Sequence, residues 1–183
     1  MSVRPHMKIQ VLGGCAAWPA PGIPCGGYLV TAEGFRLLLD PGYGTRAFEL
    51  AEFTAGDRFD VGPFRAITRS LPHFVPNAGI RIEHDEESLV YTGDTGPDPG
   101  IAELANGADT LIAEATFPDV VPDRYRPYLS TAVEAAKNAT AASVSRLMLT
   151  HLWPGSTPDA SLAAARGHYV GEVHVARPGL ELG

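Results

Sequence analysis

Three residues able to bind a metal ion each follow a short apolar run that is expected to form a strand. They are His73, Asp94 and His151, and the runs are residues 64–71, 88–92 and 146–150. Imidazole nitrogens and carboxylate oxygens are common ligands, and an aspartate can bridge two cations because its oxygens can face different ions. For one such histidine alone, a surface loop position or a hydrogen-bonded core position is the simpler interpretation. Their repetition at three strand ends predicts a metal site on the rim of a sheet.

The elements that must position these residues change character along the chain. Further strands are expected at 7–12, 27–31, 35–40, 78–83 and 110–114, with a short helix at 45–52 and longer ones at 99–105, 130–142 and 158–169. Gly34 marks a hairpin turn, and His84 lies in a charged turn where solvent exposure is expected. The first half of the chain is expected to be a meander of strands, and in the second half strands and helices alternate. This order predicts an α/β (α+β) sandwich of two sheets with outer helices, in one domain spanning residues 1–183.

Composition and charge limit the class of protein. The chain has 183 residues, 45% hydrophobic and 19% charged, which is typical of a soluble globular domain. Its net charge of -7 disfavours broad contact with nucleic acid and favours a compact substrate. Cys15 and Cys25 are too few for a disulfide framework and are expected to be reduced. No signal peptide or membrane-spanning run is recognisable, so a cytoplasmic location and no membrane partner are expected.

The order of several motifs resembles the metallo-β-lactamase superfamily, and within it the branch of ribonuclease Z and related phosphodiesterase-like hydrolases. The motifs are LLLDPGYG, PHFVPNAGIRI, YTGDTG, ADTLIAEAT, YLSTAVEAA and LMLTHLWP, and together they extend over nearly the whole chain. The resemblance implies an αββα sandwich of two mixed sheets with a two-metal site, usually zinc with manganese as the alternative. It also implies that His73 binds the first metal, Asp94 bridges both and His151 binds the second.

The activity implied by this resemblance is hydrolysis of a phosphodiester by a metal-activated hydroxide. The implied substrate is a small-molecule or nucleotide phosphodiester, with RNA as a further substrate class. Glu114 would orient a metal-binding histidine, and its alternative role is to cap a loop. Tyr128 would donate a hydrogen bond or stabilise an oxyanion, or else cover the start of a helix. Trp153 would line the substrate rim, or pack beneath the helix that follows.

One motif of this branch is missing from the sequence. Relatives have an HxHxDH motif after the DPGYG loop, whereas the six histidines here include none between Met7 and Pro72. The sandwich is therefore expected to be incomplete between about residues 45 and 57. The missing segment predicts exposed apolar surface and self-association, for instance as a homodimer. The alternatives to a hydrolase are an inactive deletion variant and a non-enzymatic binding module that keeps the fold.

Overall fold

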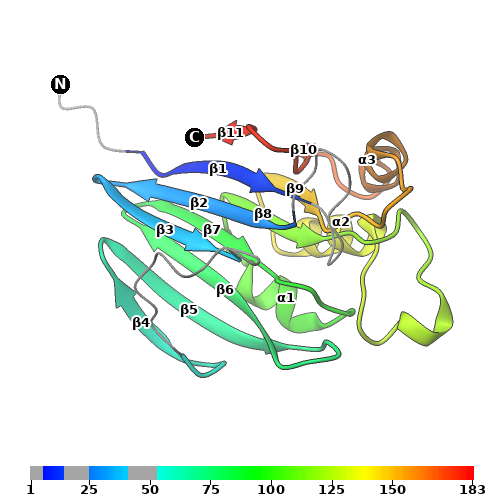
Figure 1. The fold of residues 1–183 in the computed structure, drawn as a ribbon, viewed down its shortest axis with the longest axis horizontal. Coiled ribbons are helices and arrows are strands. Elements are labelled where there is room, and N and C mark those ends of the chain that lie inside the picture. Colours follow the sequence, from blue (N-terminus) through cyan, green and yellow to red (C-terminus); the bar gives the residue numbers. More distant parts are fainter. Residues whose placement is uncertain (1–5, 15–24, 41–52) are drawn as a thin grey trace.

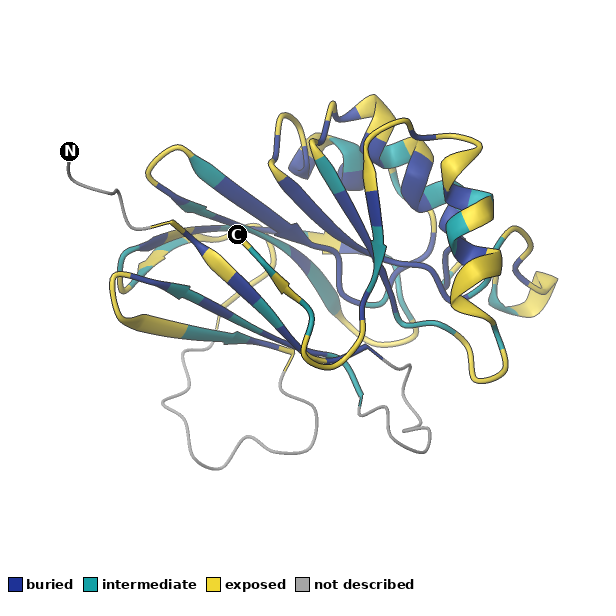
Figure 2. Ribbon diagram, turned by 90° about the horizontal axis from the view of Figure 1, so that it is seen from above, coloured by how far each residue is buried: buried dark blue, intermediate teal, exposed yellow. Residues whose placement is uncertain are grey.

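A computed structural model of the chain describes residues 6–14, 25–40 and 53–183. Two sheets pack face to face, and helices cover the outer face of the larger sheet (Figures 1 and 2). This arrangement confirms the predicted sandwich of sheets with outer helices. The predicted helix at 45–52 and Cys15 lie outside the described residues.

The smaller sheet has the order β11-β1-β2-β3 and the larger sheet the order β10-β9-β8-β7-β6-β5-β4. The strands of the first half are β1 (Lys8–Gly13), β2 (Gly27–Ala32), β3 (Phe35–Leu39), β4 (Arg58–Val61), β5 (Phe64–Leu71), β6 (Asn77–His84) and β7 (Glu87–Tyr91). Those of the second half are β8 (Thr110–Glu114), β9 (Arg146–Thr150), β10 (Glu172–Val175) and β11 (Glu181–Leu182).

The smaller sheet is built around an antiparallel hairpin of β2 and β3. The hairpin turns at Glu33 and Gly34, whose φ angles of 50° and 80° are the left-handed values that a tight two-residue turn requires. β1 and β11 extend the sheet, also by antiparallel pairing. The hairpin predicted from Gly34 is confirmed.

The larger sheet changes from antiparallel to parallel in its middle. β4 to β7 form an antiparallel meander, whereas β7, β8, β9 and β10 run parallel to one another. Parallel strands need crossover connections, and this is why helices appear only in the second half. Their carboxyl ends therefore lie at one edge of the sheet, where Asp94 and His151 follow β7 and β9.

Alternate residues of the parallel strands are buried in two separate cores. Leu111 and Leu147 pack against the helices, whereas Ile112 and Met148 pack against the smaller sheet. Successive side chains of a strand point to opposite faces, so a strand between two layers must be apolar on both. This burial explains the continuous apolar runs that precede the candidate ligands.

The α-helices begin at capping residues, whereas the one 3-10 turn among the described residues does not. The elements are α1 (Pro99–Leu104), η2 (Asp123–Tyr125, the 3-10 turn), α2 (Ala132–Ala141) and α3 (Pro158–Arg166). Asp98 and Thr157 cap α1 and α3, and Thr131 forms a capping box with Glu134 at the start of α2. Because Thr131 is the cap, α2 begins two residues later than predicted.

Other short elements differ from the prediction. β4, β10 and β11 were not predicted, because strands of 4, 4 and 2 residues carry too little periodic pattern. The expectation that His84 is solvated is wrong: it ends β6, is 5% exposed and packs against Phe64. No helix in the described part of the chain is long and apolar enough to cross a membrane.

Candidate metal centre

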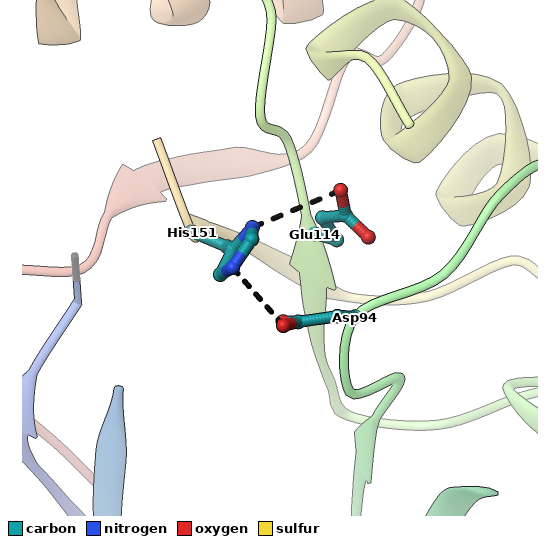
Figure 3. A group of neighbouring side chains, drawn as sticks. All are labelled: Asp94, Glu114 and His151. Atoms are coloured by element: carbon teal, nitrogen blue, oxygen red, sulfur yellow. Dashed lines mark ion pairs between the residues drawn. The ribbon is translucent and has the colours of Figure 1, made fainter. Parts of the chain in front are cut away.

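Asp94, Glu114 and His151 meet at the carboxyl edge of the larger sheet. Glu114 is the last residue of β8, His151 follows β9, and Asp94 lies in the loop after β7. One ligand atom from each lies within 4.8 Å of the others, and Figure 3 shows His151 between the two carboxylates. The cluster therefore follows directly from three neighbouring parallel strands ending at one edge.

The backbone turns sharply where two of these strands end. Gly93 has a φ of 62°, and a Cβ atom there would lie 2.4 Å from Oδ1 of Asn77. His151 has a φ of 60°, a left-handed conformation that is uncommon for a residue other than glycine. Such strained positions concentrate at functional sites, where the surrounding structure holds them.

Glu114 is a buried carboxylate whose oxygens are already occupied by hydrogen bonds. It is 1% exposed and accepts from the backbone N–H of Thr95, the Thr116 hydroxyl at 2.5 Å and the backbone N–H of Ser130 at 3.2 Å. These donors anchor the carboxylate in the loop network behind His151. Glu114 is therefore better suited to hold the histidine in place than to bind an ion itself.

Thr116 connects Glu114 to His151 and fixes the protonation pattern of the imidazole. The Thr116 hydroxyl donates to Glu114, so its oxygen accepts from Nδ1–H of His151 at 2.9 Å. Nε2 of His151 then carries the free lone pair of the neutral ring. It lies 3.0 Å from Oδ2 of Asp94, but it is buried and has no well-aligned hydrogen bond.

This unsatisfied nitrogen beside a carboxylate is what a cation site requires. Buried polar atoms normally have a hydrogen-bond partner, so each exception needs a physical reason. A cation between Nε2 of His151 and Oδ2 of Asp94 would satisfy both atoms, and Thr116 would supply the outer hydrogen bond that metal-binding histidines usually make. The residues present therefore fit a metal ion.

Burial and neighbouring charges shift the pKa values of this cluster. Burial raises the pKa of Glu114 to about 7, against the lowering effects of His151 and its hydrogen-bond donors. Burial alone would lower the pKa of His151, but the carboxylates of Asp94, Glu114 and Asp40 together raise it above its usual value. His151 therefore holds its proton to a higher pH than an exposed histidine.

We expect the zinc affinity of the chain to rise with pH, because a cation at Nε2 must displace this proton. Affinity should fall by about tenfold for each pH unit below the raised pKa of His151. Competition with a chromophoric chelator between about pH 5.5 and 8 would measure the dependence. His174→Gln, which removes a histidine that pairs with Glu172, is the control and should leave the curve unchanged. An affinity that does not vary over this range would contradict the expectation.

His73 lies beside this cluster, on the wall of a cavity of about 440 Å³ that Asp94 also lines. Its Nδ1 lies 3.0 Å from the backbone oxygen of Tyr128, which leaves Nε2 as its remaining nitrogen. Among the described residues, the group whose ligand atoms approach within 4.8 Å contains Asp94 and His151 but not His73. The structure thus brings two of the three predicted ligands together and places the third on the adjoining wall.

Tyr128 and Trp153 lie at the rim outside the cluster. The backbone oxygen of Tyr128 contacts His73, and its ring packs against Phe74 with centroids 4.2 Å apart. Trp153 is 39% exposed and stacks on Phe117. The roles predicted for both side chains, in hydrogen bonding and at the substrate rim, remain predictions.

Two further residues of the site were not identified from the sequence. Asp40 follows β3 with a φ of 50°, lines the same cavity as Asp94 and accepts a 2.6 Å hydrogen bond from the Tyr91 hydroxyl. A carboxylate that ends the apolar run LLLD was the available signal. Thr116 could not be identified from the sequence, because an isolated threonine after a strand has no distinctive pattern.

Two packed sheets with outer helices and a histidine–carboxylate cluster at the strand ends correspond to the metallo-β-lactamase fold. The chain belongs to the metallo-β-lactamase superfamily: residues 27–152 match the family described as a beta-lactamase superfamily domain. The superfamily and fold predicted from the motifs are thereby confirmed.

Individual relatives support the same assignment. The metallo-beta-lactamase fold protein YhfI from Bacillus subtilis has a similar structure, with a TM-score of 0.86 at 21% identity, covering 97% of this chain and 99% of that one. The uncharacterized protein ML1173 from Mycobacterium leprae is 33% identical over 128 residues, which are 69% of this chain and 45% of the relative. A ribonuclease Z from Haloferax volcanii is 43% identical over 98 residues, 52% of this chain and 31% of that enzyme. The chain spans about half the length of the first of the curated relatives that it matches.

Proposed function

We propose that this chain is a metal-dependent hydrolase that acts on phosphodiester bonds, with zinc as its cation. The observation that carries the proposal is the buried Nε2 of His151, which lies 3.0 Å from Oδ2 of Asp94 without an aligned hydrogen bond. Nε2 of His84 is also buried without a hydrogen bond, so the feature that distinguishes His151 is the carboxylate that faces its nitrogen. Nε2 of His151 and Oδ2 of Asp94 are held together as an ion pair, and a cation that displaced the proton between them would have both atoms as ligands.

Zinc accepts nitrogen and oxygen ligands, and His151 and Asp94 would hold it, with His73 as the candidate third ligand from the cavity wall. A bound cation supplies Lewis acidity and a water of lowered pKa. Manganese is the alternative, because carboxylates also suit that ion.

The residues around these ligands have separate roles. Glu114 and Thr116 keep the proton on Nδ1 of His151 and so direct the lone pair of Nε2 toward Asp94. The strained backbone at His151 and the left-handed Gly93 hold the two ligands at this edge. Asp40 adds negative charge to the cavity that Asp94 lines, which favours a cation there.

The substrate class follows from two supports. The highest sequence identity among the relatives described above, 43% over 98 residues, is to a ribonuclease Z, an enzyme whose name denotes RNA cleavage. A phosphodiester also carries the negative charge that a cation attracts, and the cavity of about 440 Å³ can admit a compact substrate. We therefore propose a small-molecule or nucleotide phosphodiester as the substrate, with RNA as a larger member of the same class.

The test combines metal content with turnover of bis(p-nitrophenyl) phosphate. The purified chain, its mass checked against 19.4 kDa, is dialysed against zinc and its bound metal is quantified. We expect at most one firmly bound zinc per chain, because the HxHxDH ligands are missing, and slow hydrolysis that stops when a chelator is added. Bound zinc without hydrolysis would favour the inactive variant or binding module instead. Two firmly bound zinc ions would show that the missing motif is dispensable.

A further inference from the structure

An exposed group of aromatic rings lies beside the metal cavity and is not explained by metal binding. The rings come from the loop after β5, the long connection between β8 and α2, and the loop after β9. We call this group the aromatic platform, and its members are Phe74, Phe117, Tyr125, Tyr128 and Trp153.

The rings of the platform form a continuous path. Phe74 lies 4.2 Å from Tyr128 and 6.2 Å from Tyr125, measured between ring centroids. Tyr125 lies 6.4 Å from Trp153, which in turn lies 5.5 Å from Phe117. Phe74 and Tyr128 are inclined by 31° and Phe117 and Trp153 by 21°, whereas Phe74 meets Tyr125 edge to face at 82°. The platform therefore consists of two pairs of nearly parallel rings that Tyr125 connects.

Two of the five rings of the platform are exposed to solvent, and the other three are partly buried. Phe74 is 54% exposed and Trp153 is 39% exposed, although each touches other rings. Burying a large aromatic side chain is strongly favourable, so rings that stay exposed beside a cavity indicate a surface used for binding. Packing of the loops alone would account for the contacts between the rings but not for this exposure.

The platform adjoins the metal cavity. The ring of His73, which lines the cavity with Asp94, lies 5.2 Å from Phe74. The Arg124 guanidinium lies over the ring of Tyr125, 4.5 Å from its centroid. A ligand that joins an anionic group to a flat apolar ring would contact both the cavity and the platform.

We propose that the aromatic platform binds a nucleobase of the substrate by stacking, while the adjoining phosphate faces the metal cavity. This inference rests on the proposed phosphodiester hydrolase and narrows its substrates to nucleotides. Every base has a π-face, so stacking on aromatic side chains tolerates different bases. The occupant is inferred to be a base because His73, on the wall of the metal cavity, contacts Phe74, so a ring stacked on the platform would have its phosphate at the cavity.

The test compares adenosine 5′-monophosphate with ribose 5-phosphate, which differ only in the base. Binding of each to the full chain is measured by calorimetry, with zinc and again with a chelator. We expect the nucleotide to bind about tenfold more tightly in both conditions, because stacking needs no metal. Equal affinities for the two ligands would overturn the proposal that the platform binds a base, whether or not the chain hydrolyses phosphodiesters. A preference for the nucleotide in a chain without zinc-dependent hydrolysis would support the platform and refute the proposed function.

Variants locate the binding surface. Phe74→Ala and Trp153→Ala should each weaken binding of adenosine 5′-monophosphate by about tenfold and leave ribose 5-phosphate unaffected, whereas Trp153→Phe should restore most of the affinity. Val120→Ala is the matched control, because Val120 is 63% exposed in the same connection but has no ring. An equal loss of affinity for both ligands would overturn the proposal. It would also be overturned if sedimentation showed that the rings instead hold two copies of the chain together. If a variant does not fold, the comparison of the two ligands on the unaltered chain still tests whether the platform binds a base.

Discussion

Replacing Asp94 by asparagine is expected to weaken zinc binding by more than about a hundredfold. The substitution preserves the shape of the side chain but removes the charge that faces Nε2 of His151 at 3.0 Å. Removing only a hydrogen-bond partner of a ligand typically costs about tenfold to a hundredfold in metal affinity, and loss of the ligand itself must cost more. Competition with a chromophoric chelator at constant pH would measure the change.

Two further variants test whether the loss of zinc affinity is specific to Asp94. Asp119→Asn removes one negative charge from an exposed position in the connection after β8, and it should leave zinc affinity unchanged. His73→Ala should lower the affinity by a smaller factor than Asp94→Asn, since His73 lies on the cavity wall outside the closest cluster. Equal zinc affinity in the unaltered chain and in Asp94→Asn would refute the metal centre described above.

The strands that carry the site could be predicted because their burial is visible in the sequence. β8 and β9 are buried on both faces, so their residues form uninterrupted apolar runs, and the polar residue that ends each run is easily recognised. The same reasoning located β7 and hence Asp94, whereas β5, which precedes His73, was recognisable by its alternating pattern. Strand ends are thus the part of such a site that sequence reveals best.

The side-chain contacts between strands could not be predicted in the same way. Thr116 and His151 are far apart in sequence, and their 2.9 Å contact depends on the pairing of β8 with β9. The prediction that His84 is exposed was wrong for a related reason. The turn around His84 is charged, but its ring packs on Phe64 and lies 3.2 Å from the Pro63 carbonyl. Local polarity does not report which layer of the fold covers a residue.

Glu114→Gln is expected to change how the stability of the metal-free chain depends on pH. Folded Glu114 has a pKa of about 7, whereas its ordinary value is 4.5. Between these values the folded chain binds a proton that the unfolded chain has released. The contribution of Glu114 to the free energy of unfolding is therefore complete below pH 4.5 and is lost as the pH rises through about 7.

Glutamine cannot titrate, so the variant lacks this loss. Relative to Glu114→Gln, the free energy of unfolding of the unaltered chain should fall by about 3 kcal/mol between pH 4.5 and 8, since each pKa unit corresponds to about 1.4 kcal/mol. His151 lies 3.8 Å from Glu114, so the measured change belongs to the pair. Urea unfolding at several pH values, with chelator present, would measure it, and Glu103→Gln on the surface is the control with no such difference. Parallel stability curves for the unaltered chain and Glu114→Gln would show that the carboxylate is charged in the folded protein throughout this range, and that its three hydrogen-bond donors outweigh its burial.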